Sequence, residues 1–567
     1  MEQLRQKIRD ALQRNPWQLP EFFRESMLAG RQNSLHQLWL NVSSYDNTTH
    51  LNACESLWTA FCFIDCGWDP LLPNDGGPRE LQGNEAQAVV NLFHWASELA
   101  LPSSAFAASF DETIEVTEAK AVICLPDRSV ASSPDVILAM VSLASEQDPW
   151  TTEDTTMSAS MHLDVTCQDG VFPIIESLLK EKIRPLFAKT KNPAITSEGR
   201  KNLHPIPLSR FDGSALDDST KPWKNTDIYV TSVISWVISQ YKPADKKHLE
   251  AHFPLLVPVI LAFIDDSSIG LKTKGCELLI AILKPIQKSG SDILIRTNLI
   301  SVFDDAVTPC LLSLPTITPE DSSLKILGAA YPALLSLLKA AYINPSTKKA
   351  QPQIEKDKET YILSLTKILR SNLIHSFHHI SSSTPASATT SASFPHPRLS
   401  TFLLEWISTF VKELGIHTTK YLQDIVPALY TTLSNPFGTA HPPLLFAAVS
   451  ATKSVILNTH PRVWRWRGEL LGGLSACWLH VVSEIKEKQQ NKDEKSNADV
   501  AELDKSRWEL QSTVFVLKHA LQNPVSGVEG GPDVDQLLAK ESMQKELQEL
   551  VNADPQLETL LFAEVKS

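Results

Sequence analysis

The chain has 567 residues, of which 43% are hydrophobic and 7% aromatic, and a formal net charge of −13. This is the composition of a folded protein and not of a disordered one. Lys and Arg form no clustered run, which argues against direct binding of DNA or RNA. The length exceeds one compact core, but a repeat protein avoids that limit because its core extends along one dimension.

The first residues, MEQLRQKIRD, are charged and contain no apolar segment of the kind found in secretory signals, so we expect no secretion. The longest apolar run, 253–264, is too short to span a bilayer and carries two prolines. Eight cysteines are spread along the chain without the spacing of a disulfide framework. We therefore expect a reducing compartment, the cytoplasm with the nucleus as a second location, and no membrane association.

Residues 1–165 are predicted to be an irregular helical N-terminal region. Helical patches are expected around 4–12, 51–63 and 86–99, separated by turn-rich stretches. A polar, acidic stretch at 144–158 is predicted to be a loop.

Apolar periodicity becomes regular after residue 165. A helix is predicted over 171–189, bent or broken at Pro185, and a loop follows at 196–219. After residue 224, apolar side chains recur at i, i+3 and i+4 and predict another helix. Scarce glycine and abundant proline indicate many short helices joined by tight turns.

The stretch 253–283 contains two apolar helical stripes separated by an acidic and then a basic turn, which is typical of a HEAT repeat. The stripes consist of Leu255, Leu256, Val259, Ile260 and Phe263, and of Gly275, Leu278, Leu279, Ile282 and Leu283. Such a helix pair cannot bury its apolar face alone, so it requires stacked neighbours. We predict an all-α fold, with a central HEAT-like α-solenoid of antiparallel helix pairs over 166–380.

The remainder of the chain divides by composition. Residues 381–398 begin with a Ser/Thr/Ala-rich stretch and are predicted to be a linker or insertion. Residues 399–567 are predicted to be a C-terminal helical region. Within it, the charged segment 486–505 has nearly balanced signs and indicates a solvated helix or loop. The last helix is predicted at 534–550.

The tetrad Lys221-Pro222-Trp223-Lys224 is the first candidate site. It places a rigid proline and a large aromatic side chain before a helix, between two cations. Trp223 either anchors the start of that helix by packing on its first turns, or contacts a partner, since buried tryptophans dominate many interfaces.

A second candidate set lies in the turn of the HEAT-like block. Asp265 and Asp266 precede Lys272 and Lys274. These four charges either form a ladder within the repeat or present an electrostatic edge to a partner. The architecture favours the ladder.

Catalytic and metal-binding signatures are absent or incomplete. Gly270 and Gly275 have the spacing of a phosphate-binding loop, but Cys276 and Glu277 stand where that loop needs Lys and Ser or Thr. Three further groups are better explained as core or surface residues: Cys54, Cys62 and Cys66; His375, His378 and His379; and the segment Gly473 to Cys477. We expect no enzyme activity, no cofactor and no metal.

An ordered series of short segments across 170–345 resembles a known family. The segments are 182–189, 195–201, 221–224, 254–258, 272–276, 296–299, 309–315 and 330–332. Together they are similar to the second Tel-two-interacting protein (Tti-two) family, whose members are subunits of the TTT cochaperone complex.

The resemblance implies a HEAT-like helical protein without catalysis that binds Tti-one-like and Tel-two-like HEAT proteins. Through that complex it would support the maturation and stability of phosphatidylinositol-3-kinase-related kinases, with a heat-shock chaperone and the R2TP assembly, and so affect TOR signalling and the DNA damage response. The alternative is a HEAT-repeat transport or trafficking adaptor that binds a small GTPase. A third possibility, an enzyme with an unfamiliar site, requires a cluster of perturbed ionisable groups that the sequence does not show.

Overall fold

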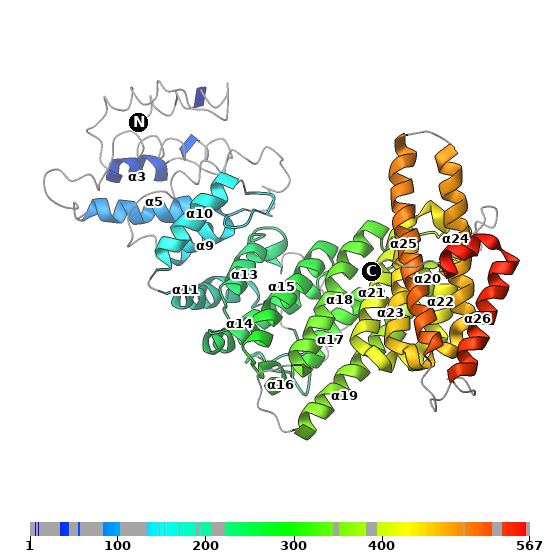
Figure 1. Ribbon diagram of the computed structural model, residues 1–567. Helices are drawn as coiled ribbons and strands as arrows, with labels where there is room; N and C mark the ends of the chain where they lie inside the picture. The colour runs from blue at the N-terminus through cyan, green and yellow to red at the C-terminus, as the bar shows by residue number, and fades with distance from the viewer. Residues whose placement is uncertain are drawn as a thin grey trace. The chain divides into compact units, whose positions relative to one another are not determined.

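The computed structural model describes most of the chain (Figure 1). The described residues are 6, 9, 10, 35–44, 55, 56, 83–102, 133–205 with gaps at 147, 152, 169, 189–191 and 197, 221–343, 351–381, 394–490, 494–523 and 536–562. Within them every regular element is a helix, apart from one isolated bridge between Ile195 and Lys201. The prediction of an all-α fold is confirmed.

The chain forms two compact units. The first unit comprises 1–266 and 274–302, and the second comprises 267–273 and 303–567. The boundary passes through α15 and α17, and each unit is described by itself.

The first unit contains short helices followed by two long ones. Its helices are α3 (Leu35–Ser43), α5 (Asn84–Ala100), α9 (Pro134–Ser142), α10 (Glu153–Thr166), α11 (Phe172–Ser177), the π-helix η1 (Leu178–Ile183), α12 (Arg184–Leu186), the 3-10 helix η4 (Pro222–Lys224), α13 (Val230–Ser239), α14 (Lys246–Ile264), most of α15 (Ile269–Lys288), α16 (Ile293–Arg296) and the start of α17 (Ile300–Val307).

The centre of the N-terminal part is α9, whose residues from Val136 to Ser142 are all buried. It packs against α5, α10 and α13. The predicted helix at 86–99 corresponds to α5, whereas the predicted loop at 144–158 is wrong from Glu153 onward, where α10 begins. The buried side of α10 includes Thr156 and Ala159, which are too weakly hydrophobic to mark a helical stripe in the sequence. The predicted patches at 4–12 and 51–63 lie almost wholly outside the described residues.

The helical path continues through Pro185 instead of breaking there. Residues 172–186 form α11, η1 and α12 without interruption, and the π-helical turns precede the proline. A π-helix adds a residue to the turn and is a recognised way to relieve a local mismatch in hydrogen bonding.

Prolines also lie inside long helices, so the prediction that they separate short ones is wrong at these positions. The internal prolines are Pro254 and Pro258 in α14, Pro285 in α15, Pro332 in α18 and Pro427 in α22. Each removes one helical hydrogen bond. The extensive burial of α14 and α18 supplies the packing that keeps those helices intact.

The second unit is built mainly of longer helices. They are α18 (Glu320–Tyr342), α19 (Gln351–Ile368), the π-helix η6 (Leu369–Ile374), α20 (His375–Ser381), α21 (Pro397–Leu414), α22 (Leu422–Leu433), α23 (Pro442–Thr459), α24 (Arg467–Gln490), α25 (Glu494–Gln522), α26 (Gln536–Ala553) and α27 (Glu558–Leu561), with short 3-10 helices η5 (Thr308–Leu312), η8 (Gly415–Tyr421), η9 (Gly438–Ala440), η10 (His460–Trp466) and η11 (Pro555–Leu557).

Four of these helices form one layer, in the order α18, α21, α23, α25, in which each packs on the next (Figure 1). Arg398 at the start of α21 pairs with Asp321 at the start of α18 at 2.6 Å. Lys339 near the end of α18 pairs with Glu413 near the end of α21. The two helices therefore run parallel.

The helices α23 and α25 also run parallel to each other. The ammonium group of Lys505 lies 4.5 Å from the ring centroid of Phe446. About two turns further along both helices, Lys453 donates a hydrogen bond to Ser512 at 2.9 Å. The helix α22, which lies between α21 and α23 in the sequence, packs on α24. Each of these helices therefore packs on the second helix after it in the sequence.

The two low-complexity predictions have different outcomes. Residues 382–393 lie outside the described residues, and α21 begins at Pro397, inside the predicted linker at 381–398. The charged segment 486–505 is helical where described, because α24 extends to Gln490 and α25 starts at Glu494. The last predicted helix at 534–550 corresponds to α26.

Two helices, α14 and α18, are long and apolar enough to cross a membrane by length and composition alone. More than half of each apolar window is buried within the protein, 56% and 61% respectively. Core helices of soluble proteins pass the same test, so this finding is weak evidence of a membrane span.

We predict opposite effects for alanine at two helical glycines. A Cβ at Gly275 in α15 would lie 2.7 Å from the backbone nitrogen of Ile264, so Gly275→Ala should reduce the free energy of unfolding by about 1–3 kcal/mol. A Cβ at Gly328 in α18 meets nothing within 4 Å, so Gly328→Ala should raise it by about 0.5–1 kcal/mol. Melting temperatures of the two variants test this, and equal shifts would contradict it.

Candidate functional site

The tetrad forms the short helix η4 beside the end of α14, and its tryptophan is part of an aromatic cluster. Trp223 is 2% exposed. Its ring stacks on Phe187 with centroids 4.3 Å apart and an angle of 11° between the planes. Phe263 meets both rings edge-on, at 5.8 Å from Phe187 and 6.3 Å from Trp223. These are the contacts of an anchoring side chain, and they leave almost none of the indole for a partner.

Both lysines of the tetrad pair with one aspartate. Lys224 Nζ lies 3.1 Å from Asp266 Oδ1, and Lys221 Nζ lies 3.7 Å from Asp266 Oδ2. The aspartate side chain is fully buried and each lysine side chain is only 14% exposed. A buried carboxylate is costly unless it is paired, so the two cations compensate its burial.

The four charged residues of the predicted ladder do not pair with one another in any ion pair among the described residues. Asp266 is paired with the tetrad, and the exposed Asp265 accepts a hydrogen bond from Asn192 Nδ2 at 2.8 Å. Lys274 lies near Asp148, where its charge partly offsets the rise in the pKa of that carboxyl caused by burial. Lys272 lies on α15, partly exposed. The ladder was expected because the four charges are close in sequence. Asp266 instead pairs with Lys221 and Lys224, which lie more than 40 residues earlier in the chain.

Three of the short segments that carried the family resemblance meet in space. The backbone nitrogen of Lys201 donates to the carbonyl of Thr297 at 3.0 Å, and its Nζ donates to Ser301 at 2.7 Å. Gly199 has φ of +65°, and a Cβ there would lie 2.6 Å from the Cα of Pro254. A side chain at Gly199 would therefore push the 195–201 turn away from α14.

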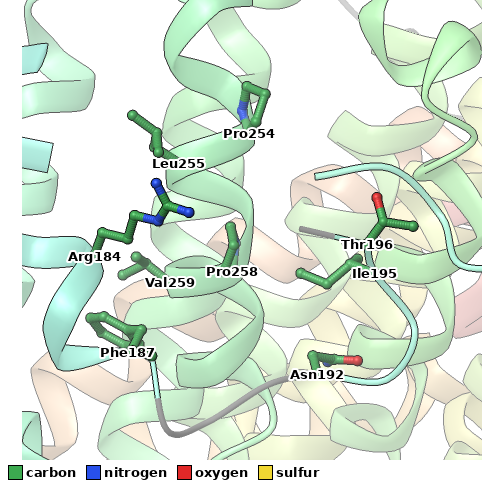
Figure 2. Close-up of a pocket in the computed structure, with 10 residues that line it drawn as sticks. Arg184, Phe187, Asn192, Ile195, Thr196, Pro254, Leu255, Pro258 and Val259 are labelled. Carbon is green, nitrogen blue, oxygen red and sulfur yellow. The ribbon is translucent and has the colours of Figure 1, made fainter. Parts of the chain in front are cut away.

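A pocket of about 510 Å³ lies between this turn, the end of the 172–187 helical segment and α14. Figure 2 shows Arg184 and Phe187 on one side and Asn192, Ile195 and Thr196 on the other, with α14 as the shared wall. The lining residues are Arg184, Phe187, Ala188, Asn192, Ile195, Thr196, Pro254, Leu255, Pro258 and Val259. Most of the lining is apolar, as in typical ligand pockets.

The sequence groups considered for metal or catalysis gain no support where they are described. No group of three or more His, Cys, Asp or Glu side chains in the described part of the chain is arranged to hold a metal ion. Gly270 and Gly275 lie inside α15 and not in a loop. Burial raises the pKa of Cys477 to about 12, so its thiol is protonated at neutral pH and is a poor nucleophile. Cys54, Cys62 and Cys66 lie outside the described residues.

A second surface was missed by the sequence. On α25, Lys505, Trp508, Ser512 and Phe515 follow each other at helical spacing, and Trp508 is 59% and Phe515 52% exposed. Leu457 of the adjacent α23 is 56% exposed. We call this set, with Lys453 and Phe446, the α23–α25 face.

The two lysines of the α23–α25 face have different surroundings. Lys453 pairs with Glu509 at 3.0 Å and lies 6.0 Å from the ring centroid of Trp508. The ammonium group of Lys505 lies over the ring of Phe446, 4.5 Å from its centroid. The face therefore combines exposed apolar rings with an exposed lysine. The spacing of Trp508 and Phe515 was the available signal, but it is equally compatible with a core stripe.

The model of the Tti2 family matches residues 136–440 of the chain, more than half of its length. The chain belongs to the Tti2 family. The match includes the tetrad, Asp266 and the pocket, and it extends on both sides beyond the 170–345 stretch that carried the resemblance. It ends before α23, so the α23–α25 face lies outside the matched residues.

We predict that Trp223→Ala destabilises the protein strongly. The substitution removes a buried ring stacked on Phe187, and large-to-small changes of this kind cost about 3–5 kcal/mol. The exposed Trp508 is the matched control, since Trp508→Ala should leave the melting temperature nearly unchanged. A normal melting temperature for Trp223→Ala would contradict the anchoring role.

We also predict different effects for neutralising the two neighbouring aspartates. Asp266→Asn removes the negative charge that Asp266 supplies to two poorly solvated lysines and should reduce the free energy of unfolding by about 2 kcal/mol. Asp265→Asn changes an exposed side chain and should cost less than about 0.5 kcal/mol. Chemical denaturation of both variants measures the difference, and a larger loss for Asp265→Asn would refute the assignment.

Proposed function

We propose that the chain is a non-catalytic scaffold subunit of a TTT-type complex, bound to Tti-one-like and Tel-two-like HEAT proteins. Membership of the Tti2 family carries this proposal. In that role it would support the maturation and stability of phosphatidylinositol-3-kinase-related kinases, together with a heat-shock chaperone and R2TP. We propose the cytoplasm as its location, with the nucleus as a second one.

The helix arrangement of the second unit supports a scaffold. In an α-solenoid, equivalent helices of successive pairs stack in parallel, and the intervening helices form a second layer. The layer α18, α21, α23, α25 and the packing of α22 on α24 follow that pattern. We infer that the second unit is a HEAT-like solenoid of antiparallel helix pairs.

We further propose that the α23–α25 face binds a helix of the Tti-one-like partner. Exposed tryptophan and phenylalanine side chains are the residues that contribute most to binding when they enter a pocket. Lys505 favours a partner surface that places a carboxylate beside its apolar contacts. The occupant expected from this chemistry is an amphipathic helix with acidic residues flanking its apolar stripe.

Affinity purification of the tagged chain followed by mass spectrometry tests the proposal. We expect Tti-one-like and Tel-two-like proteins in the eluate of the wild-type chain. Trp508→Ala combined with Phe515→Ser should reduce recovery of the Tti-one-like protein by about tenfold or more, because exposed aromatic hot spots contribute over 2 kcal/mol each.

The control is Leu363→Ala, which removes a side chain that is 61% exposed on α19 in the same unit and should leave recovery unchanged. Absence of both HEAT proteins from the wild-type eluate would overturn the scaffold function. A small GTPase in their place would support the transport adaptor instead. Normal recovery with the double variant would reject only the α23–α25 face.

A further inference from the structure

The pocket beside the tetrad combines an apolar wall with a positively charged side chain at its rim. Its apolar wall includes Pro254 and Pro258, which are four residues apart and so lie on the same side of α14. Both are partly exposed, and Figure 2 shows them facing the pocket from α14.

The proline pair leaves backbone acceptors without helical donors. In an α-helix the N–H of residue i donates to the carbonyl of residue i−4. Pro258 has no N–H, so the carbonyl of Pro254 lacks that donor, and Pro254 deprives Glu250 in the same way. The Pro254 carbonyl oxygen lies close to the 195–201 turn, 3.2 Å from the Cβ position at Gly199. Because Pro254 itself lines the pocket, its carbonyl is an acceptor beside the cavity that receives no hydrogen bond from residue 258 of α14.

A positive charge stands at the rim of the same pocket. Arg184 is exposed, its guanidinium extends toward α14 above Val259 (Figure 2), and it forms no ion pair with any described residue. On the opposite rim, the hydroxyl of Thr196 accepts a hydrogen bond from the backbone nitrogen of Arg200 at 3.3 Å. Asn192 is engaged as well: it donates to Asp265 and accepts from the backbone nitrogen of Ala194. An anion that enters the pocket thus meets one available guanidinium.

We propose that this pocket binds a short extended segment of a partner protein, with an apolar side chain inside the cavity and an adjacent Asp or Glu carboxylate on Arg184. A backbone N–H of the segment donates to the Pro254 carbonyl. A helical segment is disfavoured because its own N–H groups are already bonded, whereas an extended one has them free. The charge-assisted contact with Arg184 selects the acidic residue, and the apolar cavity selects its neighbour.

The site is separate from the α23–α25 face, and its existence does not depend on the proposed function. The test is to pan a random peptide library displayed on phage against the full-length chain. Enriched sequences should contain an apolar residue followed within two positions by Asp or Glu. A synthetic peptide with the consensus should bind in a fluorescence polarisation assay.

Two variants define the site. Arg184→Glu reverses the rim charge, and Ala188→Phe fills the cavity from an exposed lining position, so both should fold. Each should weaken binding of the consensus peptide by about tenfold or more. The matched control is Arg370→Glu, another exposed arginine without an ion pair among the described residues, which should bind normally.

Several results would overturn the proposal. They are failure of the library to yield a consensus, enrichment of peptides without acidic residues, and undiminished binding by Arg184→Glu and Ala188→Phe. Native mass spectrometry that finds a small apolar carboxylic acid bound to the purified chain, and absent from Ala188→Phe, would assign the pocket to a small molecule instead.

Discussion

The stacking of Trp223 on Phe187 is the contact on which the middle of the first unit depends. It joins the end of the 172–187 helical segment to η4, and Phe263 joins both to α14. The indole N–H has no acceptor among the described residues, so ring burial must outweigh the cost of an unmade hydrogen bond. The pairing of Asp266 with the flanking lysines fixes η4 from the other side. Phe187 also lines the pocket, so the same stack positions the pocket wall.

The all-α class and most helices of the central region were predictable because their apolar side chains recur at helical spacing and are buried, as in α14. The pairing of Asp266 was not predictable, since charge partners depend on how distant segments meet. Proline positions were misleading because the burial of α14 and α18 offsets the hydrogen bond that each internal proline removes. Trp508 was ambiguous for another reason: the same spacing describes a buried stripe and an exposed one, and only packing distinguishes them.

The two candidate binding surfaces differ in physical character. The pocket is concave, lies within the family match and depends on α14, where prolines free backbone acceptors. The α23–α25 face consists of exposed rings with lysines over them, and lies beyond the match. The first is suited to a short extended chain and the second to a helix. The two proposals therefore assign different ligands to the two surfaces, a peptide segment to the pocket and a helix of a folded partner to the α23–α25 face.

The parallel layer of the second unit has a consequence for how this part of the chain unfolds. Each helix of the layer packs on the layer helices that precede and follow it in the sequence. Among the described helices, no extensive packing joins α18 at one end of the layer to α25 at the other. Unfolding therefore starts at the terminal helices and proceeds inward in steps, with a gradient of amide-exchange protection that rises from α26 toward the interior of the layer.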